Sequence, residues 1–145
     1  MNGQKESFKA RLVARGFQEN TKPQSDSPTA MRESFKLFLA ITANSSFQMR
    51  AIDIRAAFLQ AEPLKREVII QPPKDLSKEG KIWRLLKPIY GLDDASRRFW
   101  LTVKRIIKEE CMSNLTGDEA FYDEREGEYL IGTFLTHVYD FHTCK

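Results

Sequence analysis

Alternating and helical patterns of apolar residues divide the first half of the chain into strands and helices. Period-2 alternation predicts strands over 9–14 and 48–54. Between them, apolar residues at helical spacing predict a helix over 29–43, with Thr29 as its N-terminal cap. The small and apolar residues 56–59 favour one helical turn directly after the second strand.

The middle of the chain repeats this order. Short apolar runs at 68–71 and 82–86 predict two further strands, joined by a polar loop. An amphipathic helix is predicted over 94–111, where Asp93 or Asp94 can cap its start. A strand–helix pair is therefore predicted twice.

The last third predicts a hairpin. Its strands cover 120–123 and 128–138, the turn lies at Glu126-Gly127, and the second strand leads to Tyr139 and Asp140. Strands that follow one another through tight turns pair antiparallel. The chain is thus predicted to be α+β, with an antiparallel sheet packed against two amphipathic helices.

Composition permits a folded, nucleic-acid-binding protein. The 145 residues are 41% apolar, enough for the core of one domain or of part of one, and the net charge is +3. Positive residues are concentrated between Lys81 and Lys108. This stretch can contact nucleic acid, but it can equally form a solvated helix face.

Several classes of protein are not supported. The two cysteines, Cys111 and Cys144, lack the spacing of a zinc site and fit a reducing intracellular setting. No apolar run is long enough to cross a bilayer, so no membrane contact is expected. Because strand-like runs lie at both ends, we expect an excerpt of a longer protein.

Two aspartates on predicted strands are candidate metal ligands. Asp53 lies between Ile52 and Ile54, so its carboxylate leaves the strand on the opposite face from theirs. Together with Asp140 it suggests a site where carboxylates hold metal ions around phosphate. Without context, either residue is better explained as a surface or capping carboxylate than as a metal ligand. Tyr139 stands where a further carboxylate is expected.

Residues 9–140 resemble the reverse transcriptase domain of copia-type retrotransposon Pol polyproteins. The resemblance rests on six blocks in order: KARLVARGFQ (9–18), SPTAMR (27–32), DIRAAFL (53–59), IYGLDDASRRFW (89–100), DEAFY (118–122) and HVYDF (137–141). It implies that residues 1–145 form one partial domain, the fingers and palm of a right-hand polymerase. The thumb, connection and RNase H parts are expected to be absent.

The resemblance implies RNA- and DNA-directed DNA polymerase activity on a template-primer with deoxynucleoside triphosphates. It makes Asp53 and Asp140 catalytic ligands of two Mg²⁺ ions. Phe58 becomes the aromatic gate beneath the sugar, which a ribose 2′-hydroxyl would strike. A set of cations in the fingers strand is expected to neutralise the triphosphate or the template: Lys9, Arg11 and Arg15.

The block at 89–100 is expected to lie near the nascent base pair. Arg97 and Trp100 can bind or stack on nucleic acid, with packing of an amphipathic helix as the alternative. Asp93 and Asp94 replace the usual Lys and Gln of the family. Because an anion repels phosphate, a nucleotide contact by Asp94 is doubtful.

The family ends its catalytic hairpin with two adjacent aspartates, whereas Tyr139 replaces the first of them here. A phenol cannot supply the missing charge, so weakened or abolished catalysis is predicted. Three readings remain: a working polymerase segment, an inactive retrotransposon remnant, and a non-catalytic nucleic-acid-binding module. The expected partner is the rest of a Pol polyprotein. The expected location is intracellular, in cytoplasmic virus-like particles, with the nucleus as an alternative.

Overall fold

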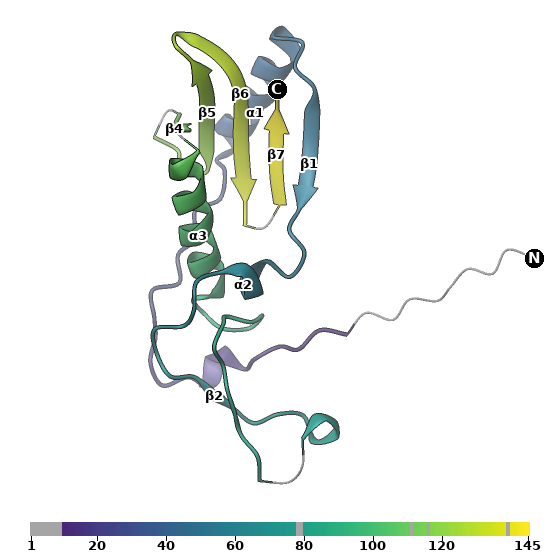
Figure 1. Cartoon of the computed structure of the whole chain (residues 1–145), viewed down its shortest axis with the longest axis vertical. Coiled ribbons are helices and arrows are strands. Elements are labelled where there is room, and N and C mark those ends of the chain that lie inside the picture. The colour runs from purple at the N-terminus through teal and green to yellow at the C-terminus, as the bar shows by residue number, and fades with distance from the viewer. Residues whose placement is uncertain (1–9, 78–79, 111, 116, 139) are drawn as a thin grey trace, which may run out of the picture.

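The computed structural model describes residues 10–77, 80–110, 112–115, 117–138 and 140–145. Its central element is a five-stranded sheet in which every neighbouring pair is antiparallel (Figure 1). The strands, in spatial order, are β1 (Met49–Asp53), β7 (Asp140–Cys144), β6 (Tyr129–His137), β5 (Phe121–Glu126) and β4 (Ser113–Asn114). The predicted α+β class is confirmed.

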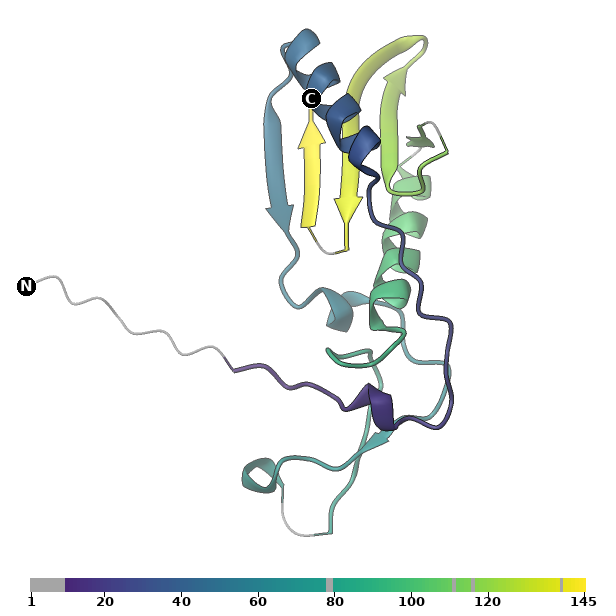
Figure 2. The same cartoon turned by 180° about the vertical axis from the view of Figure 1, so that it is seen from behind.

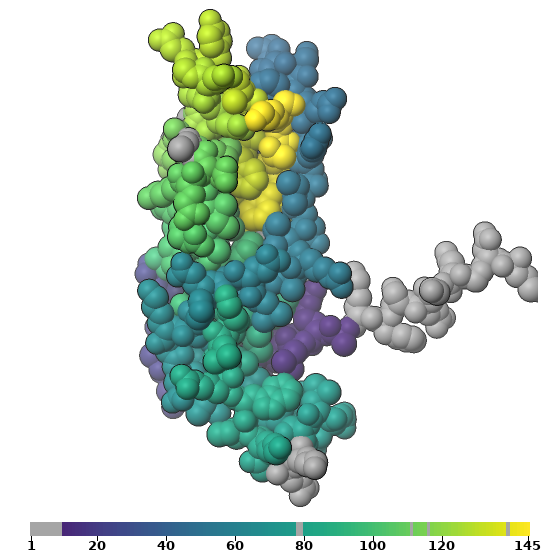
Figure 3. Space-filling view, in the orientation of Figure 1, coloured from purple at the N-terminus to yellow at the C-terminus, as the bar shows by residue number. Residues whose placement is uncertain are grey.

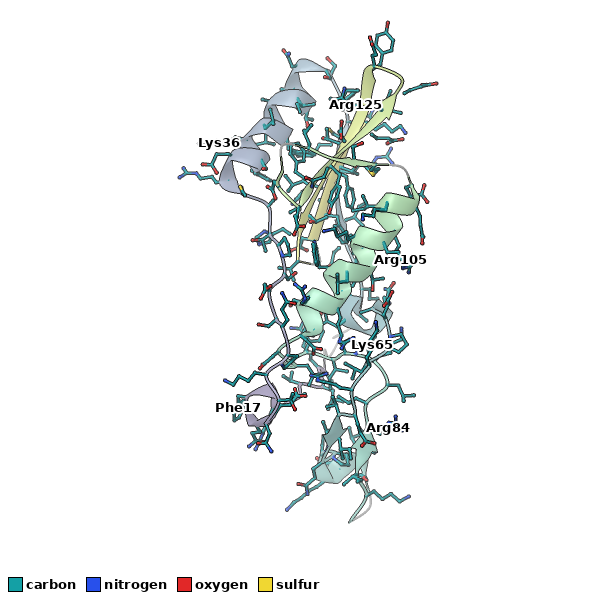
Figure 4. All side chains as sticks on the ribbon, turned by 90° about the vertical axis from the view of Figure 1, so that its left-hand side faces the viewer. Phe17, Lys36, Lys65, Arg84, Arg105 and Arg125 are labelled. Carbon is teal, nitrogen blue, oxygen red and sulfur yellow. The ribbon has the colours of Figure 1, made fainter. Side chains whose placement is uncertain are left out.

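The two long helices lie on opposite faces of this sheet. Figure 2 shows α1 (Arg32–Asn44) across one face, and Figure 4 shows the sheet between α1 and α3 (Ala95–Glu109). On the α1 face, Phe38 is fully buried and packs with Leu135. On the α3 face, Phe99 packs against Phe141, with ring centroids 6.2 Å apart. Two apolar cores, one on each face, therefore hold the layers together.

A second lobe lies beyond one end of the sheet. The short helix α2 (Ala57–Gln60) packs against α3, and β2 (Ile69–Ile70) pairs with β3 (Trp83–Arg84). Figure 3 shows this lobe with the described start of the chain, in purple, against it; we call residues 10–18 the N-terminal segment. Two short 3₁₀ helices complete the described elements: η1 (Gly16–Gln18) and η2 (Lys74–Leu76). No helix among the described residues has the length and apolarity to cross a bilayer.

The predicted strand over 9–14 is wrong for the part that the structure describes. Val13 makes a single parallel bridge with Tyr90. The backbone N–H of Ala14 donates to the Tyr90 carbonyl at 2.7 Å, and that of Gly16 donates to Gly91 at 3.0 Å. The segment thus docks on a turn instead of a strand partner, so pairing ends after one bridge. Lys9 lies outside the described residues.

The predicted cap of the first helix is also wrong. The helix begins at Arg32, and Thr29 instead forms a bridge with His137. The carboxylate of Asp118 accepts a 2.9 Å hydrogen bond from the backbone N–H of Met31. A carboxylate from a distant loop therefore caps α1.

The pKa of Asp118 reflects this role. Burial raises it, but hydrogen bonds from the Ser34 hydroxyl and the N–H groups of Met31 and Ala120 outweigh burial. The net result is a pKa below the ordinary value of 3.8. The ionised carboxylate is thus the form that the fold stabilises.

The predicted end of the hairpin needs correction as well. Asp140 does not extend the second hairpin strand; it begins β7, which lies between β1 and β6. Val138, in the turn that joins β6 to β7, has φ of 57°, which is unusual for a β-branched residue. The chain reverses within this tight turn, so β7 can pair on both sides.

Candidate functional site

Asp53 and Asp140 lie opposite each other in the structure. Asp53 is the last residue of β1 and Asp140 is the first of β7, and the two are direct partners in the β1–β7 register. Opposite residues of an antiparallel pair point to the same face, with Cβ atoms about 4.5–5.5 Å apart. Both side chains are exposed. Two residues far apart in sequence are thus register partners at one end of the sheet, where Figure 1 shows the end of β1 beside the start of β7.

His137 extends this pair to a row of three. It is the direct partner of Asp140 on the other side, in the β6–β7 register, and it is exposed. We call Asp53, Asp140 and His137 the sheet-end row. The sequence placed His137 in a motif block without a role of its own, because the register that brings it beside Asp140 is set by pairing.

A pocket of about 280 Å³ adjoins the row on the α1 face. His137 and Asp140 line its sheet side, together with His142, whose ring packs edge-on against Phe35 at 5.9 Å between centroids. The remaining lining residues come from the segment before α1, from α1 itself and from β6: Ala30, Met31, Arg32, Phe35 and Leu135. The carboxylate of Asp140 therefore borders a hollow that combines imidazole, guanidinium and aromatic groups.

The row does not fit two Mg²⁺ ions. Mg²⁺ requires octahedral oxygen coordination, and a pair of ions needs several carboxylate oxygens between them. The row supplies two carboxylates, and within the described part of the chain no three His, Cys, Asp or Glu side chains converge to hold a metal ion. Tyr139, where the third carboxylate is expected, lies outside the described residues.

Phe58 lies in the core, close to the end of β1. Only 6% of Phe58 is exposed, and its ring packs edge-on against Tyr90 at 4.6 Å and against Phe99 at 6.5 Å between centroids. The guanidinium of Arg11 lies over the Tyr90 ring at 4.5 Å from its centroid. Tyr90 thus joins an exposed cation of the N-terminal segment to the expected gate residue. The contact of Phe58 with a sugar stays a prediction.

The other expected phosphate-binding cations are less closely placed. Arg15 is exposed and directly precedes η1. Lys9 lies outside the described residues. Of the three cations, the structure places Arg11 in contact with the Tyr90–Phe58 pair, a relation that the strand pattern could not predict.

Trp100 and Arg97 lie on α3 and interact with the protein itself. Trp100 is 7% exposed, with the Arg97 guanidinium 5.7 Å and the Lys104 ammonium 4.5 Å from its ring centroid. Arg97 also donates to the backbone carbonyl of Asp26 at 3.0 Å. This geometry supports the packing alternative for Trp100, while Arg97 stays partly accessible.

Asp94 occupies the N-cap position of α3 without capping it. Its carboxylate, 4% exposed, accepts hydrogen bonds from Arg98 Nε at 2.6 Å and from Arg66 Nη2 at 3.0 Å. Arg66 Nη2 also donates to Glu19 at 2.9 Å. Asp94 therefore neutralises protein cations inside the fold. No motif in the sequence pointed to Arg66 as a partner of Asp94, because only the tertiary fold brings these residues together.

Comparison with known proteins assigns the family. Residues 1–140 match the reverse transcriptase (RNA-dependent DNA polymerase) family. The retrovirus-related Pol polyprotein from transposon TNT 1-94 of Nicotiana tabacum is 27% identical over 139 residues, covering 92% of this chain and 10% of that protein. The corresponding polyprotein from transposon RE2 of Arabidopsis thaliana is 28% identical over 137 residues, covering 90% and 9%.

A yeast relative is somewhat more similar over a shorter stretch. The transposon Ty1-ER2 Gag-Pol polyprotein of Saccharomyces cerevisiae is 30% identical over 108 residues, covering 72% of this chain and 6% of that protein. The chain spans a tenth or less of the length of these curated relatives. No solved structure matches it. The chain belongs to the reverse transcriptase family, in the branch found in Pol polyproteins of copia-type retrotransposons.

Proposed function

We propose that the chain forms the fingers and palm of a copia-type reverse transcriptase whose nucleotidyl transfer is impaired by Tyr139. In this proposal the five-stranded sheet with α1 and α3 is the palm, and the second lobe with residues 10–18 belongs to the fingers. The chain binds an RNA or DNA template-primer and a deoxynucleoside triphosphate. It works inside the cell, in cytoplasmic particles, beside the other parts of a Pol polyprotein.

One observation carries the proposal: Asp53 and Asp140 stand in register on one face at one end of an antiparallel sheet. A phosphoryl-transfer site needs carboxylates gathered from separate segments. The loop after β1 leads directly into α2, which carries Phe58. Figure 1 shows α2, which carries Phe58, beyond the end of β1 where Asp53 lies, and this arrangement supports a nucleotide site there.

The Arg11 guanidinium is suited to a triphosphate. Arginine binds phosphate oxygens with paired N–H donors. An aromatic face orders the arginine side chain beforehand, so less conformational entropy is lost when phosphate binds. Tyr90 provides that face. Phe58, fixed by Tyr90 and Phe99, has a ring that cannot move aside for a 2′-hydroxyl. Nucleotide selection can thus persist where the chemical step fails.

The impairment follows from the donor set. Two Mg²⁺ ions would supply activation of the primer hydroxyl and stabilisation of the leaving pyrophosphate, but the described carboxylates are too few to hold them. Tyr139 adds a neutral phenol at the position of the expected ligand. Binding without turnover is the expected behaviour.

Primer extension tests this proposal. The chain is joined to the thumb of a related polymerase and compared with Tyr139→Asp, with Tyr139→Asp plus Asp53→Asn as the matched control. We expect product from Tyr139→Asp alone, because only that variant has three carboxylates. Equal extension by the unchanged chain contradicts the impairment. Absence of product from all three variants contradicts the assignment of the defect to residue 139.

The non-catalytic module is the second candidate, and the basic outer face of α3 favours it. A surface hollow of about 540 Å³ is lined by three cations, Lys104, Arg105 and Lys108, together with Leu101 and Glu109. Lys104 and Arg105 are paired with Glu119 and Glu109, whereas no ion pair is found for Lys108 within the described residues. Phosphate binding at this face needs no metal ion.

Salt-dependent binding tests whether the basic face of α3 contacts phosphate, as the module candidate requires. Fluorescence anisotropy of a labelled primer-template is measured across a salt series for the chain, Lys108→Ala and the control Lys36→Ala on the outer side of α1. If α3 contacts phosphate, Lys108→Ala lowers the slope of log K against log salt by about 1 and Lys36→Ala leaves it unchanged. Affinity that is undetectable even at low salt excludes the module.

A further inference from the structure

The five-stranded sheet has one short edge and one long, open edge. At one margin lies β4, which has two residues, and at the other lies β1, which has five residues and is exposed at every position (Figure 1). A long edge strand presents N–H and C=O groups with which another strand can pair. We propose that β1 pairs antiparallel with β1 of a second copy of this chain, so that one sheet runs through both subunits. This inference does not depend on polymerase activity.

The backbone of β1 has donors and acceptors on its open side. Gln48 and Lys145 exchange two backbone hydrogen bonds, at 3.1 Å and 3.4 Å, and so form a hydrogen-bonded pair. Hydrogen-bonded and non-hydrogen-bonded pairs alternate along an antiparallel ladder. The register with β7 therefore directs the N–H and C=O groups of Met49, Ala51 and Asp53 away from β7. Within the described part of the chain, these outward groups have no strand partner.

β1 has neither of the backbone features that close an edge. Prolines and bulges prevent edge strands from pairing, but β1 contains no proline and its register with β7 runs without a shift. Ala51 pairs with His142, which packs on α1, whereas Ile52 pairs with Phe141, which packs on α3. The side chains of β1 thus alternate between the two faces. Met49 is 54% exposed and Ile52 42%, so pairing removes apolar surface from water.

Two charges in β1 select the register of the dimer. A two-fold axis through Arg50 or Asp53 would place like charges directly opposite each other, which is destabilising. An axis through Met49 or Ile52 would pair only part of β1 with its copy. An axis through Ala51 pairs all three sets of outward groups, with Met49 opposite Asp53 of the partner subunit. Arg50 then lies opposite the partner's Ile52, which its methylene stem can cover.

The size of the contact predicts a weak dimer. A strand of five residues is about 17 Å long, and the apolar side chains added at its margins are those of Met49 and Ile52. Such an interface is smaller than the roughly 1,200–2,000 Å² that stable complexes bury. We therefore expect a dissociation constant on the order of tens of micromolar, with monomers in dilute solution.

Sedimentation equilibrium of the purified chain, from about 1 to about 200 μM, tests the dimer. Ala51→Lys places two ammonium groups at the axis and should raise the dissociation constant at least about tenfold. Ala40→Lys, at an exposed position of α1, makes the same change of residue and charge and should alter it less than about twofold. Circular dichroism confirms that each variant is folded.

A proline variant tests the same edge without a charge. Ala51→Pro removes an outward N–H and leaves the hydrogen bonds to β7 in place, so it should also abolish the dimer. A monomer at every concentration of the unchanged chain would overturn the inference and leave the edge to an extended segment of another protein. A dimer that survives both Ala51 variants would place the contact elsewhere and overturn it as well.

Disulfide cross-linking reports the register. Ala51→Cys places two thiols at the axis on Cα atoms about 5.5 Å apart, within the range of a disulfide. Ile52→Cys is the matched control, because the two copies of residue 52 are offset by about 7 Å along the strands in addition to the spacing across them. The unchanged chain, with Cys111 and Cys144, gives the background on a non-reducing gel. We expect at least about fivefold more linked dimer from Ala51→Cys, and equal yields would overturn the register.

Discussion

The carboxylate of Asp94 accepts a 3.0 Å hydrogen bond from Nη2 of Arg66, which lies in the segment after α2. Asp94 is 3% exposed and also binds Arg98 on the next turn of α3. Through Arg66 and Glu19, this contact joins the start of α3 to both the N-terminal segment and the loop that follows Phe58. The Asp94 carboxylate is thus paired inside the fold.

Removal of the Asp94 carboxylate should destabilise the fold. Asp94→Ala leaves Arg66 and Arg98 without their shared counter-ion. Because both guanidiniums keep partial solvent contact, we expect a loss of about 2–3 kcal/mol, below the roughly 3–5 kcal/mol for a fully buried pair. Urea unfolding measures it. Asp93→Ala, at the exposed neighbouring position, should change stability by under about 0.5 kcal/mol, and equal losses in both variants would contradict the structural role.

Asp118 should make stability depend on acid pH. Its folded-state pKa lies below the ordinary 3.8, so its ionised form stabilises the fold above that pH, and this stabilisation is lost as pH falls below it. Asp118→Asn should cost about 1–2 kcal/mol at neutral pH, as loss of a helix cap does. The difference in melting temperature from the unchanged chain should shrink below about pH 4. A difference that stays constant with pH would count against this role.

Gly91→Ala and Gly127→Ala together separate the cost of backbone strain from the cost of a steric clash. Both have positive φ, 89° and 61°, but a Cβ on Gly91 would lie 2.0 Å from the Ala14 carbonyl oxygen, whereas one on Gly127 meets nothing within 4 Å. Gly127→Ala should cost about 1 kcal/mol, the strain of the left-handed conformation. Gly91→Ala must also push residues 13–16 away, so its cost in thermal unfolding should exceed this by about 2 kcal/mol or more. Equal costs would mean that the N-terminal segment is not docked on Gly91.

Truncation of Phe58 should destabilise the fold, whatever role its ring has in sugar selection. Because it is 6% exposed and packs on Tyr90 and Phe99, Phe58→Ala should cost about 3–4 kcal/mol in urea unfolding. Leu59→Ala, on the same short helix but 53% exposed, should cost under about 1 kcal/mol. Any test of ribonucleotide discrimination therefore needs Phe58→Tyr or Phe58→Leu, which keep the core filled. A small loss for Phe58→Ala would place its ring outside the core.

The pattern of apolar residues predicted the elements whose conformation depends on residues close in sequence. The two long helices, the short helix α2 and the strand that ends at Asp53 lie within a few residues of their predictions, because apolar periodicity reflects which face each element buries. The helix start at Arg32 was missed, since its cap is Asp118, a residue that only tertiary contact brings near. The strand predicted over 9–14 is wrong in its described part for a related reason: Val13 forms only one bridge, and its partner Tyr90 precedes a turn.

The candidate site divides in the same way. The sequence by itself determined the family, through motif blocks in fixed order, and it singled out Asp53, Asp140 and the replacement at Tyr139. Only the tertiary structure decided that Asp140 begins a new strand opposite Asp53 and beside His137. The physical reason is that the residues of a strand do not determine by themselves which strands pair with it. Hydrogen-bond pairing and the packing of each sheet face against α1 or α3 set the register, and the register sets which side chains meet.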